Sequence, residues 1–245
     1  MSYIITVRTN ESILMASDTR LNYFDEVTLN GKKYQRIIAV ADCIRKTFFI
    51  ETAKIGIQFL GIGFFQDIDG EKYPLSHFVR RIDNMLPLYG YDFEANSKKI
   101  FEFLKGISRV GDTGRYVKGI MSGFSKNGVS YLCCFNTYNN EFEIKEFHIG
   151  LFVDSENNGN PFPISEKEAI EEINKRIDSV AMKKCWIVGG PVEILKITHE
   201  GGVFIKENPK LFNGTQKELI DCFKSNINKI NGIIFPNPIL VEYQF

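Results

Sequence analysis

The fold of this chain is decided by residues 3–20, which read YIITVRTNESILMASDTR. Two short apolar runs, Tyr3–Arg8 and Ile13–Ser17, are separated by the polar stretch Thr9–Ser12. Apolar runs rich in β-formers on either side of a short polar turn are typical of a β-hairpin. We therefore expect two antiparallel strands at the start of the chain, the second of which ends at Asp18-Thr19-Arg20.

Outward from this hairpin, strand patterns and helical patterns arrive in blocks. Strands are predicted over 46–51, 54–63, 118–125, 129–136, 141–149, 186–198, 203–206 and 239–243. Helices are predicted over 75–86, 96–107, 165–180 and 215–230. Residues 21–45 are polar and predict a long excursion with one further hairpin at Asn30-Gly31. This order favours antiparallel sheets covered by helices, an α+β domain.

Size and composition limit the classes of protein that this chain can belong to. Its 245 residues suit a single domain over 1–245, because no repeat or linker interrupts the pattern. Hydrophobic residues make up 44% and charged residues 24%, which excludes a largely disordered chain. Thirty basic residues balance thirty acidic ones, and this zero balance argues against a nucleic-acid partner.

The sequence also indicates in which cellular compartment the protein resides and whether it binds a cofactor. No run approaches the roughly 20 apolar residues of a membrane span, and MSYIITVR lacks the features of a signal peptide. Five cysteines without a CxxC motif fit the reduced thiols of a cytoplasmic protein. No histidine has a second ligand at metal spacing, and Gly61-Ile62-Gly63 lacks the third glycine of a dinucleotide site. We expect neither membrane, metal nor cofactor.

Candidate chemistry begins at Ser2. If Met1 is removed, Ser2 carries a free α-amine beside its own hydroxyl, and the ordinary pKa of such an amine, about 7.7–8.0, suits a general base. One residue would then supply both nucleophile and base. Asp18 ends the second strand and so returns to the start of the first, while Lys46 opens a later strand. A buried ammonium paired with Asp18 would favour the alkoxide and keep the amine neutral.

These residues carry a resemblance to a known family. Residues 3–20 look like the N-terminal hairpin of proteasome β-type subunits, in the N-terminal-nucleophile (Ntn) hydrolase superfamily. That family opens with a catalytic Thr and carries an Asp sixteen residues later, the spacing (18 − 2) of Ser2 and Asp18. Residues 45–61, RKTFFIETAKIGIQFLG, are similar to the stretch of bacterial proteasome-like peptidases that ends at the oxyanion glycine. This similarity lays the essential Lys of that family on Lys46 and its glycine on Gly61.

The resemblance implies a fold and an activity. The implied fold is a four-layer α/β/β/α sandwich of two antiparallel sheets, and the implied activity is hydrolysis of a peptide or a small amide. Ser2 would attack the carbonyl, Asp18 and Lys46 would set the electrostatics, and the backbone N–H of Gly61 would stabilise the oxyanion. The resemblance also implies a homo-oligomeric ring.

Secondary candidates follow from the same resemblance, and so do departures from it. Arg20 closes the Asp-Thr-Arg ending, Gly189 opens the pair of glycines that the family carries, and His148 falls near the nucleophile in the alignment. However, Cys185 and Val188 stand where the family has the Asp and the Ser that orient the amine. This departure favours an alternative, an inactive proteasome-like subunit that acts as scaffold or ring partner. A third reading is an unrelated α+β domain with a chance likeness.

Overall fold

The computed structural model describes residues 3–61, 63–108, 116–154, 161–184, 187–224, 233–234 and 239–242. Its helices are α1 (Leu75–Met85), α2 (Phe93–Ser108), α3 (Glu166–Lys183) and α4 (Gln216–Lys224). Its strands are β1 (Ile4–Arg8), β2 (Ile13–Ser17), β3 (Arg20–Leu29), β4 (Lys32–Asp42), β5 (Thr47–Ile50), β6 (Ile55–Leu60), β7 (Phe64–Gln66), β8 (Lys72–Pro74), β9 (Lys118–Phe124), β10 (Ser130–Asn136), β11 (Glu141–Glu146), β12 (Phe152–Asp154), β13 (Glu193–Ile197), β14 (Gly202–Lys206), β15 (Ile233–Ile234) and β16 (Ile239–Glu242).

The predicted N-terminal hairpin is the centre of the first sheet. This sheet has the order β12-β1-β2-β13-β14, and the neighbouring strands in it are antiparallel. All five residues of β1 and all five of β2 are buried. Because successive side chains on a strand point to opposite faces, burial of every residue means that the hairpin is covered on both sides.

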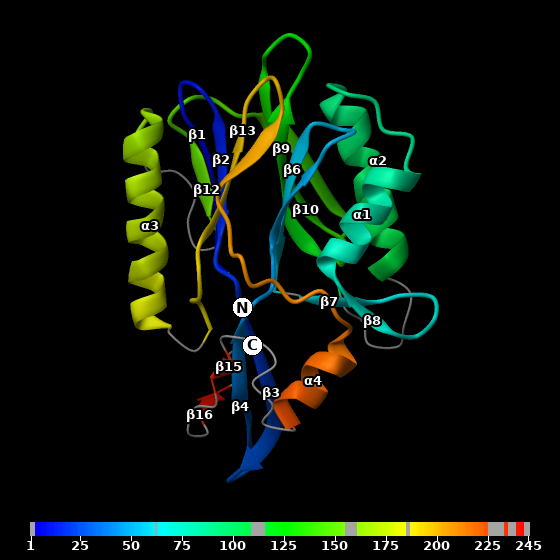
Figure 1. The fold of residues 1–245 in the computed structure, drawn as a ribbon, viewed down its shortest axis with the longest axis vertical. Helices are drawn as coiled ribbons and strands as arrows, with labels where there is room; N and C mark the ends of the chain where they lie inside the picture. The colour runs from blue at the N-terminus through cyan, green and yellow to red at the C-terminus, as the bar shows by residue number, and fades with distance from the viewer. Residues whose placement is uncertain are drawn as a thin grey trace.

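A second antiparallel sheet faces the first, with the order β11-β10-β9-β6-β5. Apolar side chains of the two sheets meet in one cluster, which includes Ile4 and Met15 from the first sheet and Leu132 from the second. On the outer face of the first sheet, Ile173 and Ile177 of α3 pack against strand residues. Helix α3 lies on one side of the molecule in Figure 1, and α1 and α2 lie on the other.

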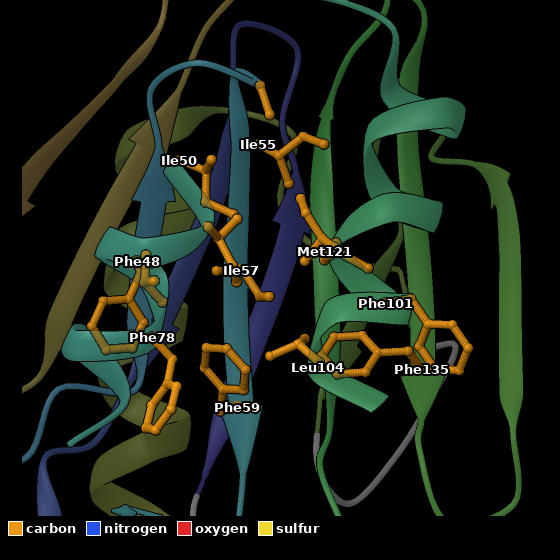
Figure 2. Close-up of a cluster of buried hydrophobic side chains, with 14 of the residues drawn as sticks. Phe48, Ile50, Ile55, Ile57, Phe59, Phe78, Phe101, Leu104, Met121 and Phe135 are labelled. Carbon is orange, nitrogen blue, oxygen red and sulfur yellow. The ribbon is translucent and has the colours of Figure 1, made fainter. Parts of the chain in front are cut away.

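The largest cluster of buried apolar residues joins α1 and α2 to the second sheet. Figure 2 shows Phe78 of α1 and Leu104 of α2 beside strand residues such as Phe59. Phe59 also makes edge-to-face contacts with two other rings of the cluster, Phe48 and Phe135. The mixed α+β class with antiparallel sheets, predicted from the pattern of elements, is confirmed.

A long hairpin of β3 and β4 extends away from the two main sheets, as Figure 1 shows. Its turn is the predicted Asn30-Gly31, and both residues have positive φ angles of 51° and 76°. Such angles suit the tight turns of hairpins, where Asn and Gly are preferred. The short strands β15 and β16 pair with β4, so that a small third sheet stands at one end of the molecule.

The structure changes some predicted boundaries. The strand expected over 186–198 begins only at Glu193, because Gly190, with a φ angle of 75°, and Pro191 interrupt it. Helix α3 begins as predicted, with the Ser165 side chain accepting a hydrogen bond from the backbone of Glu168. Residues 225–230 of the fourth expected helix and Tyr243 of the last expected strand lie outside the described residues. Within the part of the chain that is described, no helix has the length and apolarity to cross a bilayer.

Candidate active site

The candidate site is built around Asp18, which directly follows β2. The β1–β2 register pairs Ile4 with Ser17, so Asp18 comes to lie beside Tyr3. The backbone N–H of Tyr3 donates to Oδ1 of Asp18 at 2.9 Å, and the N–H of Asp18 donates to the carbonyl oxygen of Tyr3 at 3.2 Å. The hairpin thus brings Asp18 to the start of β1, as the sequence predicts. Ser2, the candidate nucleophile, lies outside the described residues.

Lys46 reaches the same carboxylate from the second sheet. Its Nζ donates to Oδ1 of Asp18 at 2.7 Å, and the two side chains are only 2% and 0% exposed. The backbone of Lys46 is fixed by a hydrogen bond of 3.0 Å from the N–H of Phe59 to its carbonyl oxygen. Burial lowers the pKa of Lys46, although the negative charge of Asp18 acts in the opposite direction. The structure therefore joins two of the predicted residues in one buried ion pair.

The other oxygen of Asp18 is also occupied. Its Oδ2 accepts hydrogen bonds from the backbone N–H groups of Arg20, at 3.2 Å, and Gly189, at 3.3 Å. The carboxylate therefore receives four donors from four separate places in the chain: Tyr3, Arg20, Lys46 and Gly189. Hydrogen bonds that satisfy an ionised carboxylate offset the cost of burying it. Two secondary candidates, Arg20 and Gly189, thus contact the site through their backbones.

The side chain of Arg20 has a different partner. Its Nε and Nη2 donate to the two oxygens of Asp42, at 2.6 Å each, in a bidentate ion pair. The guanidinium lies close to Gly189, because an added Cβ there would lie 2.6 Å from the Cζ of Arg20 and the guanidinium would have to shift. At Gly190 a Cβ would lie 2.7 Å from both Asp42 and Thr19, and the φ angle there is +75°. The two glycines therefore let the chain pack tightly against the Asp18 loop.

Gly61 directly follows β6. It lies at the C-terminal end of this strand, and that end is the one next to Lys46. The register of β5 and β6 pairs Thr47 with Gln58, so the residues after Gln58 run beside the segment that precedes Thr47. Gly61 is exposed, with a φ angle of +77°, and an added Cβ would meet no atom within 4 Å. Its positive φ angle favours glycine, and its exposure leaves room for a ligand.

His148 is not brought to this site. The N–H of Leu151 donates to the carbonyl oxygen of His148, and the N–H of Gly150 donates to the carbonyl oxygen of Arg8. His148 therefore lies beside the end of β1 opposite to Tyr3. At about 3.3 Å per residue, the five steps from Tyr3 to Arg8 span about 16 Å. The antiparallel course of β12 along β1 is the physical reason for this separation.

A buried polar network beneath the ion pair is a feature that the sequence reasoning missed. Gln58 donates to the carbonyl oxygen of Ala16 at 2.8 Å and accepts a bond of 2.7 Å from the hydroxyl of Thr6. The Thr47 hydroxyl donates to Ser17 at 2.9 Å. These contacts join the two sheets directly below Asp18 and Lys46. The sequence carries one signal of this network, which is the presence of polar residues within the apolar strand segments at residues 4–8, 13–17 and 55–60.

Glu193 is a second buried charge near the site. It pairs in register with Ser17, and its Oε1 accepts a hydrogen bond of 3.0 Å from Arg45, while its Oε2 is buried without a partner among the described residues. Burial raises the pKa of Glu193, and Arg45 opposes this shift. Burial also raises the pKa of the nearby Cys43 thiol to about 12, which makes Cys43 a poor nucleophile.

The arrangement provides a fixed ion pair at the start of the chain. A desolvated ammonium held by a carboxylate is a strong local electrostatic group, able to stabilise negative charge that develops on a neighbouring hydroxyl oxygen. Over the described residues, no group of three or more His, Cys, Asp or Glu side chains is placed to hold a metal ion.

Among known proteins, solved structures are similar to this chain, and the similarity concerns the fold. No family model matches the chain, and no curated protein matches it either. Among solved structures, an Anbu (Gly-1) mutant from Hyphomicrobium sp. strain MC1 is similar, with a TM-score of 0.56, 14% identity and coverage of 94% of this chain and 98% of that one. Anbu (ancestral beta-subunit) from Yersinia bercovieri has a TM-score of 0.55 and 14% identity, over 84% of this chain and 88% of that one.

These findings correct the family assignment made from the sequence. The resemblance in residues 3–20 and 45–61 indicated a divergent member of the proteasome β-subunit-like Ntn superfamily. That assignment does not stand, because no family model and no curated protein matches the chain. What is shared with the Anbu structures, at 14% identity, is the fold.

Proposed function

We propose that this protein hydrolyses an amide bond with Ser2 as an N-terminal nucleophile, exposed by removal of Met1. The observation that carries the proposal is the buried ion pair of Lys46 and Asp18, with 2.7 Å between Nζ and Oδ1, beside the first described residue of the chain. Tyr3 donates its backbone N–H to that pair, and its nitrogen is bonded to Ser2. Covalent geometry therefore supports a position for Ser2 beside Asp18.

In the proposed reaction, the hydroxyl oxygen of Ser2 attacks the carbonyl carbon of the amide, and the α-amine of Ser2 takes the hydroxyl proton. The Lys46 ammonium stabilises the developing alkoxide, and the backbone N–H of Gly61 binds the oxyanion. The amine then gives its proton to the leaving nitrogen, and the C–N bond breaks to leave an ester on Ser2. Water hydrolyses this ester by the same proton route, which releases the acid and restores the enzyme.

The likeness to Anbu supports the architectural part of the proposal. We propose that the helices and the two main sheets form a four-layer α/β/β/α sandwich in a single domain over 1–245, and that the protein acts in the cytoplasm on a peptide or a small amide. Assembly into a homo-oligomeric ring belongs to the same proposal. The fold likeness over 94% of the chain disfavours an unrelated α+β domain.

A second candidate function is an inactive subunit that serves as scaffold or ring partner. The observation that favours it is the residue before the paired glycines: Val188 is apolar and buried, and so offers no polar group to an α-amine. In this alternative Met1 stays on the chain and no nucleophile is exposed.

Mass spectrometry separates the two candidates. The protein purified from its native host is treated with a peptide β-lactone, and the intact mass and the labelled peptide are determined. The proposal requires a chain without Met1 and an adduct on the N-terminal peptide, absent in Ser2→Ala and retained in the matched variant Ser125→Ala. Retained Met1 supports the scaffold, and an adduct that survives in Ser2→Ala refutes the role of Ser2.

A further inference from the structure

Arg8 stands at the opposite end of the first sheet from the candidate active site. It ends β1, beside the β1–β2 turn, at the end of the molecule where Figure 1 shows the β9–β10 hairpin. Its side chain is only 9% exposed. Nε donates to Oγ of Ser130 at 2.9 Å, and Nη1 donates to the carbonyl oxygens of Thr9 and Ser12. The guanidinium also lies 5.0 Å from the ring centre of Phe124.

All of these partners are electrically neutral. Among the residues that the structure describes, no carboxylate lies within ion-pair distance of Arg8, whereas the partly buried Arg20 pairs with Asp42, and Arg45 pairs with both Glu193 and Glu207. Burial lowers the pKa of Arg8. A buried charge is normally paired, because leaving it alone in a poorly solvated site is costly. The uncompensated charge of Arg8 therefore needs an explanation beyond packing.

One nitrogen of the guanidinium makes no hydrogen bond to the described residues. Of its three nitrogens, Nε and Nη1 have the partners named above, and Nη2 has none in the described part of the chain. Nη2 is not among the fully buried side-chain atoms that lack a partner, so it keeps some exposure. Nη2 can therefore donate to a carboxylate oxygen, and a hydrogen bond between two charged partners is stronger than one between neutral partners.

Arg8 lines a pocket of about 280 Å³. Its lining combines Arg8 and Ser130 with the apolar residues Val129, Phe147 and Ile149, of which Val129 and Ile149 are exposed. The volume is close to the lower end of the roughly 300–1,000 Å³ that small-molecule sites occupy. His148, which the candidate active site leaves out, lines the same pocket, and so does Glu146, an exposed carboxylate.

We propose that this pocket binds a small carboxylic acid with an apolar tail. The carboxylate would pair with Nη2 of Arg8, and the tail would cover the apolar lining. A single guanidinium matches a single negative charge, whereas a phosphate dianion would leave one charge uncompensated beside Glu146. The proposal is independent of the proposed hydrolase function, because the pocket and the Asp18–Lys46 pair lie at opposite ends of β1.

Isothermal titration calorimetry of the full chain tests the proposal, with phenylacetate as the probe. Phenylacetamide, which has the same shape without the charge, and inorganic phosphate are the two comparison ligands. We expect phenylacetate to bind at one site, with an affinity at least about tenfold above that of either comparison ligand, since a charge-assisted hydrogen bond contributes that much. Equal binding of the amide, tighter binding of phosphate, or no saturable binding of phenylacetate overturns the proposal.

Variants locate the binding and separate it from folding. Arg8→Gln should weaken phenylacetate binding at least about tenfold. If Arg8→Gln does not fold, Ile149→Asp makes the same test from the pocket rim, because Ile149 is 52% exposed and donates no bond to Arg8. The added negative charge should weaken binding several-fold, and Glu146→Gln should strengthen it. Unchanged affinity in Ile149→Asp and Glu146→Gln, or in a folded Arg8→Gln, refutes the site.

Discussion

At the scale of single residues, the buried ion pair of Lys46 and Asp18 is the centre of the candidate active site. Removing one partner of a buried ion pair leaves the other charge without compensation, at about 3–5 kcal/mol. We therefore predict that Lys46→Met lowers the free energy of unfolding by about that amount and abolishes labelling by the β-lactone. Denaturant unfolding measures the first effect and mass spectrometry the second.

Two control variants test whether the effect of Lys46→Met comes from its pairing with Asp18. Lys175→Met removes a lysine that is 81% exposed and 3.8 Å from Glu172, and it should change stability by less than about 1 kcal/mol. The double variant Asp18→Asn/Lys46→Met removes both charges, so it should lose less stability than the sum of its single variants. Additive losses, or full labelling in a folded Lys46→Met, contradict the pairing and its role.

Glu193 gives a prediction on pH. Burial holds the pKa of this carboxyl above its ordinary value of 4.5, so the folded chain binds the proton more tightly than the unfolded chain does. The contribution of Glu193 to stability is therefore greatest below about pH 4.5 and declines as the pH rises through the folded pKa. Glu193→Gln lacks this decline, so its stability relative to the natural protein should increase from pH 4 towards pH 7. A constant difference in urea unfolding across this range contradicts the prediction.

At the scale of elements, glycines fix how closely the strands of the second sheet approach. A Cβ on Gly119 of β9 would lie 1.9 Å from the backbone oxygen of Gln58, so β6 and β9 would have to separate. We predict that Gly119→Ala destabilises the protein by about 1–3 kcal/mol. In the matched variant Gly106→Ala, within α2, the added Cβ meets nothing within 4 Å and should stabilise the helix by up to about 1 kcal/mol.

Thermal unfolding of both variants measures the difference. Equal midpoints for Gly119→Ala and Gly106→Ala would show that the sheet tolerates the extra atom. Such tolerance would contradict the tight β6–β9 contact on which the position of Gly61 depends, because Gly61 directly follows β6.

Local elements were the part of the structure that the sequence predicted well. The β1–β2 hairpin, the Asn30-Gly31 turn and the start of α3 next to Ser165 each depend on residues that are neighbours in sequence. The polar network of Gln58, by contrast, depends on which faces of two sheets meet, and no local pattern encodes that. The pairing of Asp18 with Lys46 was expected partly through a family resemblance, which shows that spacing alone was too weak a signal.

At the scale of the whole molecule, the third sheet is expected to be the least stable part among the described residues. In the distal half of the β3–β4 hairpin, Glu26, Thr28 and Leu29 are exposed, whereas every residue of β1 and β2 is buried. Segments with few buried side chains open locally at low free energy. We predict that amides over 26–34 exchange with deuterium at least about tenfold faster than those of β1 and β2. Equal protection in hydrogen-exchange mass spectrometry contradicts this prediction.

The four donors to Asp18 have a consequence for the life of the protein in the cell. They come from Tyr3, Arg20, Lys46 and Gly189, so the last of them is synthesised about three quarters of the way along the chain. A nascent polypeptide on the ribosome therefore carries its candidate nucleophile long before the carboxylate that would serve it is complete. The set of four donors around Asp18 is therefore completed only after residue 189 has been synthesised and the chain has folded around the carboxylate.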